Sequence, residues 1–125
     1  MENNDLTYVI RGAIFNVYNT LGPGLLESVY EIALDYELKA AGLKFQRQVH
    51  LPMQYKCVKM DINFRLDFLV EDKIIIEVKS IEDLLPVHHK QLLTYLKLAK
   101  LRYGVLVNFN TDNISKNIFR KVNGY

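Results

Sequence analysis

The sequence predicts an α/β (α+β) fold whose elements follow the order helix, helix, four strands, helix, strand. Three observations favour it. Residues 5–41 carry apolar side chains at spacings of three and four, as an amphipathic helix requires. After Leu43 the apolar period changes to two, which is typical of strands. Beyond Pro86 the helical spacing returns, and a second apolar strand follows it.

The first helix is expected over residues 5–20, with Asn4 or Asp5 as its cap. It ends in the segment Leu-Gly-Pro-Gly at 21–24, because glycine permits a turn there and proline prevents the helix from continuing. A second helix is expected over residues 25–41. Its apolar side consists of Leu26, Val29, Tyr30, Ala33, Leu34, Leu38 and Ala41.

The next segment predicts strands over 44–51 and 53–59, separated by Pro52, and a third over 62–70. The third strand alternates most clearly. One face is expected to carry Ile62, Phe64, Leu66, Phe68 and Val70, and the other Asn63, Arg65 and Asp67.

Residues 74–79 are apolar on both faces except at Glu77 and Lys79, which indicates a central strand. A third helix is expected over 87–101, followed by a buried strand over 103–109. The polar segment 112–125 predicts only a short strand or a turn of helix near 118–122.

Composition limits the class of protein. A chain of 125 residues, 50% hydrophobic and 24% charged, is expected to form one globular domain over 1–125, which excludes disordered and fibrous proteins. The single Cys57 excludes a disulfide framework and a CxxC metal site. No apolar run approaches the roughly 20 residues of a membrane span, and the N-terminus does not resemble a signal peptide, so we expect a cytoplasmic protein with no membrane partner.

Three charged residues form the most informative pattern. Asp67 is followed ten residues later by Glu77-Val78-Lys79, and Glu77 and Lys79 share one face of a strand that is otherwise apolar. If the intervening turn holds three residues, 71–73, Asp67 faces Glu77, whereas a two-residue turn would put Glu77 on the wrong face. We therefore predict an odd-length turn or a bulge, which brings two carboxylates and an ammonium together.

Two carboxylates with the backbone carbonyl between them form a hard oxygen site suited to Mg²⁺ or Mn²⁺. A metal there would bind a phosphate oxygen and lower the pKa of a bound water. Lys79 would orient that water or neutralise the charge that develops on phosphorus. The alternative is a buried ion cluster without chemistry, because the spacing of these three residues alone is common.

Two helices offer further candidates. Glu27 lies on the same side of its helix as Tyr30. It either stabilises the helix start through the dipole or leans over the sheet to bind a metal directly or through water. His88, Gln91 and Tyr95 form a polar stripe on the third helix. This stripe is either a solvated face or a set of contacts to phosphate or ribose.

Several segments together resemble one known family. The segments LGPGLLESVYEIALDYEL, FRLDFLV, IIIEVKS, PVHHKQLLTYLKL and YGVLVNFN are similar to those of the GxxExxY family of the PD-(D/E)XK nuclease-like superfamily, in the right order, from about residue 7 to residue 122. The resemblance implies a restriction-endonuclease-like mixed sheet flanked by helices. Two positions differ from the family pattern: Tyr18 replaces an expected His, and Cys57 an expected Gly.

The same resemblance implies roles for individual residues. Asp67, Glu77 and the carbonyl of Val78 would bind Mg²⁺ or Mn²⁺, together with Glu27. Lys79 would be the catalytic lysine, acting with Asp67, Glu77 and Glu27. The residues implied to contact substrate are Arg65, Gln91 and Tyr95. His88 is a further candidate for substrate contact, from the polar stripe of the third helix and not from the resemblance.

Three functions follow from these patterns. The first is a metal-dependent nuclease that acts on DNA or RNA, with DNA favoured, and in which a homodimer is one way to grip a duplex. The second is a catalytically silent nuclease fold that serves as a nucleic-acid-binding or assembly module. The third is a structural protein whose ion cluster organises a core; the complete set of charged residues argues against it.

The net charge of +2 hides an uneven distribution. Residues 1–87 hold nine Lys and Arg against thirteen Asp and Glu, a net charge of −4, whereas residues 88–125 hold seven against one, a net charge of +6. This layout fits a metal site beside a phosphate-binding margin.

Overall fold

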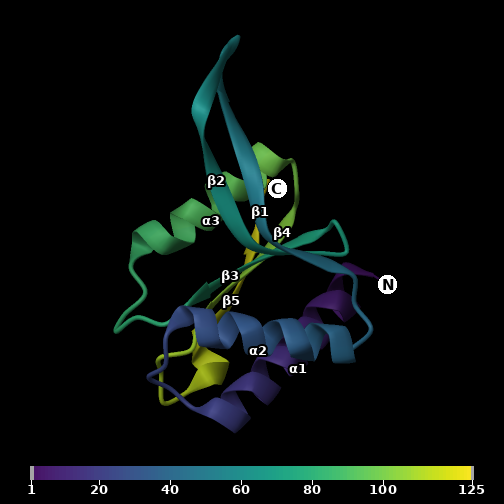
Figure 1. Cartoon of the computed structure of the whole chain (residues 1–125), viewed down its shortest axis with the longest axis vertical. Helices are drawn as coiled ribbons and strands as arrows, with labels where there is room; N and C mark the ends of the chain where they lie inside the picture. Colours follow the sequence, from purple (N-terminus) through teal and green to yellow (C-terminus); the bar gives the residue numbers. More distant parts are fainter. Residues whose placement is uncertain (1, 125) are drawn as a thin grey trace.

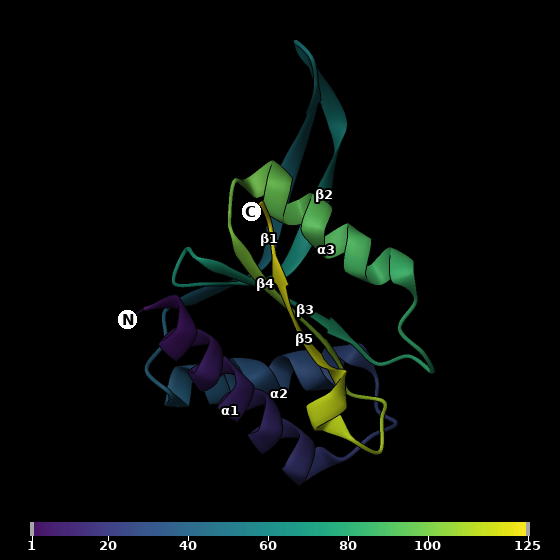
Figure 2. The ribbon, with the colours of Figure 1, turned by 180° about the vertical axis from the view of Figure 1, so that it is seen from behind.

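The sheet has helices on both of its faces (Figures 1 and 2). A computed structural model describes residues 2–124, except the side chains of Ile62 and Asn63. Its elements are α1 (Asn3–Leu21), α2 (Glu27–Ala40), β1 (Phe45–Tyr55), β2 (Val58–Val70), β3 (Ile74–Lys79), α3 (Pro86–Ala99), β4 (Tyr103–Asn108), the 3-10 turn η1 (Ile114–Asn117) and β5 (Ile118–Val122).

The five strands pair in the order β1-β2-β3-β4-β5. Strands β3 and β4 are parallel and the other pairs are antiparallel, so the sheet is mixed. This confirms the predicted fold class. It also confirms β3 as a central strand, and β5 supplies the short strand expected near 118–122.

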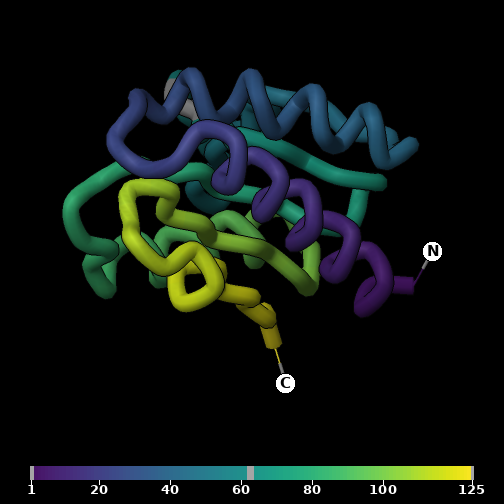
Figure 3. Tube along the Cα trace, turned by 90° about the horizontal axis from the view of Figure 1, so that it is seen from below, coloured from purple at the N-terminus to yellow at the C-terminus, as the bar shows by residue number. Residues whose placement is uncertain are grey.

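Each face of the sheet has its own hydrophobic core. On one face, α1 and α2 pack on Ile74, Ile76 and Val78 of β3. Figure 3 shows these two helices packed against one another. On the other face, α3 packs on Ile75 of β3 and Leu106 of β4. Because side chains alternate along a strand, Glu77 and Lys79 share the α3 face with Ile75.

The turn between β2 and β3 has the predicted three residues. Val70 pairs with Ile74 and Phe68 with Ile76, so the register places Asp67 opposite Glu77. Glu71 and Asp72 in the turn have φ values of 53° and 54°. The odd-length turn is therefore confirmed.

The prediction of two strands separated at Pro52 is wrong. The strand β1 continues through Pro52 to Tyr55, and the hairpin turns at 56–57, so that three strands rather than four precede α3. Pro52 is tolerated because β1 is an edge strand, where a missing N–H costs no ladder hydrogen bond. The register shifts immediately after it, between Pro52 and Gln54.

The prediction that one face of the third strand carries all its apolar residues is also wrong. Phe64 and Leu66 pack in the core beneath α3, whereas Phe68 and Val70 pack in the core of α1 and α2. The face changes at Asp67, and the side chains expected at 62 and 63 lie outside the described part of the chain.

The physical reason for this change lies on the neighbouring strand. Arg47 pairs with Phe68 and Val49 with Leu66, so Gln48 stands opposite Asp67. Gln48 has a φ of 52°, a left-handed conformation that breaks the regular pleat. The hairpin therefore rotates at this point, and the carboxylate of Asp67 reaches the backbone of β3.

Within residues 2–124, no helix combines the length and apolar character that crossing a membrane would require.

Candidate active site

Asp67 and Glu77 meet where β2 separates from β3. Regular pairing between the two strands covers only residues 68–70 and 74–76. Beyond it, the Asp67 carboxylate accepts a hydrogen bond from the N–H of Val78 at 2.7 Å, and the Glu77 carboxylate accepts one from the N–H of Asp67 at 3.3 Å. The two acids thus replace backbone partners in the sheet.

Glu77 is almost completely buried, with 7% of its surface exposed. Burial, followed by the hydrogen bond with Asp67 and the negative charge of Asp67, raises the pKa of Glu77 from 4.5 to about 10. The N–H of Asp67 and the charge of Lys79 oppose this shift but do not cancel it. Glu77 is therefore protonated at neutral pH, and its carboxyl group is hydrogen-bonded to that of Asp67.

Lys79 is the last residue of β3 and is half-buried. It pairs in register with Asn108 of β4, and its carbonyl accepts the N–H of Phe109 at 2.9 Å. The parallel pairing of these two strands fixes the backbone of the lysine beside the acid pair. The structure therefore brings Asp67, Glu77 and Lys79 together on adjacent strands.

Asn108 is a residue that sequence reasoning missed. Its side chain is 2% exposed and forms two hydrogen bonds with the backbone of Ile81, accepting from the N–H at 3.1 Å and donating to the carbonyl at 2.9 Å. Asn110 donates to the same carbonyl at 3.3 Å. Together they hold the chain that leaves β3 after Lys79. The available signal was a polar residue at the end of an otherwise apolar strand.

Gln91 and Tyr95 of α3 lie on the same face of the sheet as Glu77. Tyr95 is 7% exposed and packs against Phe64, with the ring centroids 5.0 Å apart. Burial raises the pKa of the Tyr95 hydroxyl, the negative charges of Glu77 and Asp67 raise it further, and a hydrogen bond from Gln91 opposes the shift. The predicted pair of α3 residues is therefore within electrostatic range of the acids.

Glu27 has a different position. It is the first residue of α2 and half-buried, and α2 covers the face of the sheet opposite α3. Ser80, the residue after β3, donates a hydrogen bond to the carbonyl of Leu25 at 2.5 Å, so the start of α2 is tied to the end of β3. Among the described residues, no three His, Cys, Asp or Glu side chains form a group able to hold a metal. The acid pair is therefore not joined by Glu27 in a single cluster.

Tyr30 organises the loop that leads to Glu27. Its hydroxyl donates to the carbonyl of Gly22 at 2.6 Å and accepts the N–H of Leu25 at 3.1 Å. Its ring stacks on Phe109 with centroids 4.5 Å apart. Gly24 lies between these contacts and has a φ of 94°, a backbone conformation that residues other than glycine rarely adopt. The Gly24, Glu27 and Tyr30 pattern thus shapes a turn that presents the carboxylate.

The remaining two predicted residues, Arg65 and His88, lie on β2 and at the start of α3 respectively. Arg65 is exposed on β2, two residues before Asp67, and pairs with His50 of β1. The Nδ1 atom of His88 accepts the N–H of Leu85 at 2.9 Å and thereby caps the start of α3. This bond gives His88 a structural role, and its contact with substrate stays a prediction.

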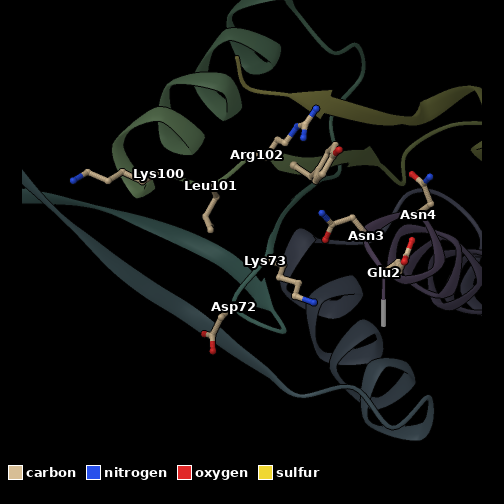
Figure 4. Close-up of a pocket in the computed structure, with 9 residues that line it drawn as sticks. Glu2, Asn3, Asn4, Asp72, Lys73, Lys100, Leu101 and Arg102 are labelled. Carbon is tan, nitrogen blue, oxygen red and sulfur yellow. The ribbon is translucent and has the colours of Figure 1, made fainter. Parts of the chain in front are cut away.

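Pockets lie at both ends of the central strands. One of about 490 Å³ is lined by Leu25, Leu26, Ser80 and Asn110, beside the start of α2 and the end of β3. Another, of about 580 Å³, lies at the opposite ends of β3 and β4 and is shown in Figure 4. Its lining mixes acidic and basic side chains, among them Glu2, Asp72, Lys73, Lys100 and Arg102. The second pocket is separate from the acid pair.

Comparison with known proteins gives one match. A family model described as the PD-(D/E)XK nuclease superfamily matches residues 4–121. No curated protein and no solved structure matches the chain. The matched range includes the acid pair, Lys79 and every other residue of the candidate site.

Proposed function

Because the chain belongs to the PD-(D/E)XK nuclease superfamily, we propose that it is a metal-dependent nuclease that hydrolyses phosphodiester bonds in DNA or RNA. The observation that supports this proposal most strongly is the reciprocal hydrogen bonding of Asp67 and Glu77, with Lys79 two residues after Glu77 on the same strand. The finer assignment to the GxxExxY family rests on Gly24, Glu27 and Tyr30 and is part of the proposal, as is a homodimer.

The acid pair fits a divalent cation such as Mg²⁺ or Mn²⁺. The carboxyl groups of the buried Glu77 and the half-buried Asp67 are hard oxygen donors, and a cation between them would take the place of the Glu77 proton. Asp67, Glu77 and the carbonyl of Val78 would hold the ion, with Glu27 acting directly or through water. When bound, such an ion polarises a phosphate oxygen and lowers the pKa of a water ligand.

The chain's own residues have distinct tasks in this proposal. Hydrolysis bonds a water oxygen to phosphorus, breaks the P–O ester bond and delivers a proton to the leaving oxygen. Lys79 neutralises the negative charge that grows on the phosphoryl oxygens. The residues proposed to contact the nucleic acid are Arg65, Gln91, Tyr95 and His88.

A cleavage assay tests the proposal. Plasmid DNA, single-stranded DNA, branched DNA and RNA are each incubated with the protein and Mg²⁺ or Mn²⁺. We expect cleavage of at least one substrate, and a loss of about 10²-fold or more in Lys79→Ala. Lys116→Ala, which changes an exposed lysine of η1, is the matched control and should retain full activity. Equal cleavage by wild type and Lys79→Ala would refute the role of the lysine.

One observation favours a second function, a catalytically silent module that binds nucleic acid or assembles with a partner. Glu27 does not join the acid pair in a group of three acidic side chains within the described residues. If nucleic acid binds but no substrate is cleaved with either metal, this second function replaces the first.

A further inference from the structure

The hairpin of β1 and β2 extends beyond the rest of the molecule (Figure 1). Only residues 68–70 of β2 pair with β3, so most of β2 has β1 as its sole neighbour in the sheet. We call residues 54–61, at the far end of this hairpin, the arm. Every residue of the arm is exposed. Such a projection contributes little to the two cores, which raises the question of what it contacts.

The side chains of the arm combine positive charge with apolar surface. The arm contains two basic residues, Lys56 and Lys59, and one acidic residue, Asp61. Tyr55 is 63% exposed and Val58 59% exposed, and each faces the other across the last register pair of the hairpin. Lysines beside exposed apolar residues on a projecting ribbon fit a polyanion that also offers apolar edges.

The distance from the arm to the acid pair restricts the partner further. Nine residue steps on β2 separate Val58 from Asp67, but only seven steps on β1 separate their partners Tyr55 and Gln48, because the register shifts after Pro52. At about 3.3 Å per step, the separation is about 23–30 Å, which is most of one turn of B-form DNA, about 34 Å. A mononucleotide or short oligonucleotide at the acid pair cannot reach the arm. Arg65 lies between the two and is exposed, so positive charge continues along the strand.

We infer that the arm is a second nucleic-acid contact, which grips double-stranded DNA most of one helical turn away from the acid pair. The inference rests on the proposed function. A two-stranded ribbon fits the major groove of B-DNA, about 12 Å wide, whereas the major groove of A-form RNA is too narrow and deep for side chains to read. Lys56 and Lys59 bind phosphates at the groove edges, and Tyr55 and Val58 face the bases.

The only cysteine of the chain gives a direct test. Cys57 lies at the tip of the arm and is exposed, so its alkylation rate reports whether the tip is covered. A duplex of about 30 base pairs should slow alkylation at least about tenfold, whereas a short hairpin duplex of about 5 base pairs, about 17 Å long, should not, because it ends before the arm when it is bound at the acid pair. Unchanged alkylation with the long duplex would overturn the inference.

A charge variant tests the same contact independently. In Lys56→Gln/Lys59→Gln, affinity for the long duplex should fall about tenfold and the slope of log K against log salt should decrease by about two, since two phosphate contacts are lost. Affinity for the short duplex should not change. The matched control, Lys44→Gln/Lys116→Gln, removes two exposed lysines outside the arm and should keep the wild-type slope for the long duplex.

Binding is measured in Ca²⁺ or EDTA, so its outcome does not depend on cleavage. If wild type cleaves DNA but the arm variant binds the long duplex like wild type, the arm inference fails and the proposed nuclease stands. If nothing is cleaved but the arm still sets duplex affinity, the proposed activity fails and the arm contact stands. A change of oligomeric state in the arm variant, measured by light scattering without DNA, would identify the arm as a protein contact and overturn the inference.

Discussion

Asp67 and Glu77 each accept a hydrogen bond from the backbone of the other's strand, at 2.7 Å from the N–H of Val78 and at 3.3 Å from the N–H of Asp67. In a regular antiparallel pair these N–H groups would bond to carbonyl oxygens. The two carboxyl groups therefore connect β2 and β3 just beyond the last regular residue pair of the two strands. The groups that are proposed to bind the metal thus also contribute to the structure of the sheet.

The buried proton predicts that Glu77→Gln stabilises the metal-free protein at alkaline pH. The folded-state pKa of Glu77 is raised from 4.5 to about 10, so the folded protein keeps a proton that the unfolded chain releases. The contribution to stability is complete below about pH 4.5 and is lost as the pH rises toward 10. Glutamine keeps a neutral hydrogen-bonding group at every pH.

At pH 8 in EDTA we expect the free energy of unfolding of Glu77→Gln to exceed that of wild type by about 2 kcal/mol, which corresponds to a rise of about 8 °C in Tm. At pH 4 the two proteins should differ little. The measurement is Tm across this pH range by circular dichroism. Glu82→Gln, at an exposed position, is the control and should follow wild type. A Glu77→Gln variant that is less stable than wild type at pH 8 would contradict the buried proton.

Metal binding should release protons from the acid pair. A cation at Asp67 and Glu77 requires both carboxylates ionised, so the proton held by Glu77 must leave. Titration calorimetry with Mn²⁺ at pH 8, in two buffers of different ionisation enthalpy, should give about one proton released per ion.

The same titration can be followed by thermal unfolding. Metal at about 100 times its Kd should stabilise wild type by about 2.7 kcal/mol, and a chelator should reverse the gain. Asp67→Asn should abolish both the stabilisation and the proton release. An undiminished metal response in Asp67→Asn would place the ion elsewhere.

Local geometry explains why the acid pair was predictable from the sequence. The relation of Asp67 to Glu77 depends only on strand alternation and on a turn of three residues, 71–73, and both are short-range properties. The central position of β3 was predictable because its residues are apolar on both faces, which requires cover on both sides.

The errors concern features that depend on distant neighbours. Pro52 ends a strand only if its N–H is needed by a partner, and the sequence does not reveal that β1 is an edge. The change of face at Asp67 depends on the left-handed conformation of Gln48, a residue whose type does not require it. Glu27 is a different case, because its role stays a prediction: its position depends on which face of the sheet α2 covers, which is a result of packing and not of helical spacing.

Replacement of Asn108 should reduce cleavage without reducing metal binding. Asn108→Ala leaves the N–H and carbonyl of Ile81 without their side-chain partner in a buried place, at a cost of about 1–3 kcal/mol. The segment after Lys79 then loses its anchor, so cleavage should fall at least about tenfold. Asp67 and Glu77 are bonded to one another independently of Ile81, so the thermal shift with Mn²⁺ should persist.

Two further variants control this experiment. Asn108→Asp keeps the acceptor for the Ile81 N–H but places a carboxyl oxygen against the Ile81 carbonyl in a buried position, so at neutral pH it should be at least as destabilising as Asn108→Ala. Asn110→Ala loses one longer bond to the same carbonyl, at 3.3 Å, and should have the smallest effect. If Asn108→Ala loses metal binding in proportion to activity, the residue acts on the acid pair and not on the lysine segment.

Tyr30 predicts a loop defect that leaves the core intact. In Tyr30→Phe the ring can still stack on Phe109, but the carbonyl of Gly22 and the N–H of Leu25 lose their common partner. We expect the free energy of unfolding in urea to fall by about 1–2 kcal/mol with an unchanged m-value, since the surface buried on folding stays the same.

Two comparison variants test whether the hydroxyl is responsible. In Tyr30→Ala the free energy of unfolding should fall by about 3–5 kcal/mol, because this change also removes a fully buried ring. Tyr36→Phe, whose ring is 70% exposed on the same helix, should match wild type. Faster amide exchange confined to residues 22–28 in Tyr30→Phe would identify the hydroxyl as the group that holds the turn before Glu27, whereas exchange spread evenly over α1 and α2 would contradict a local role.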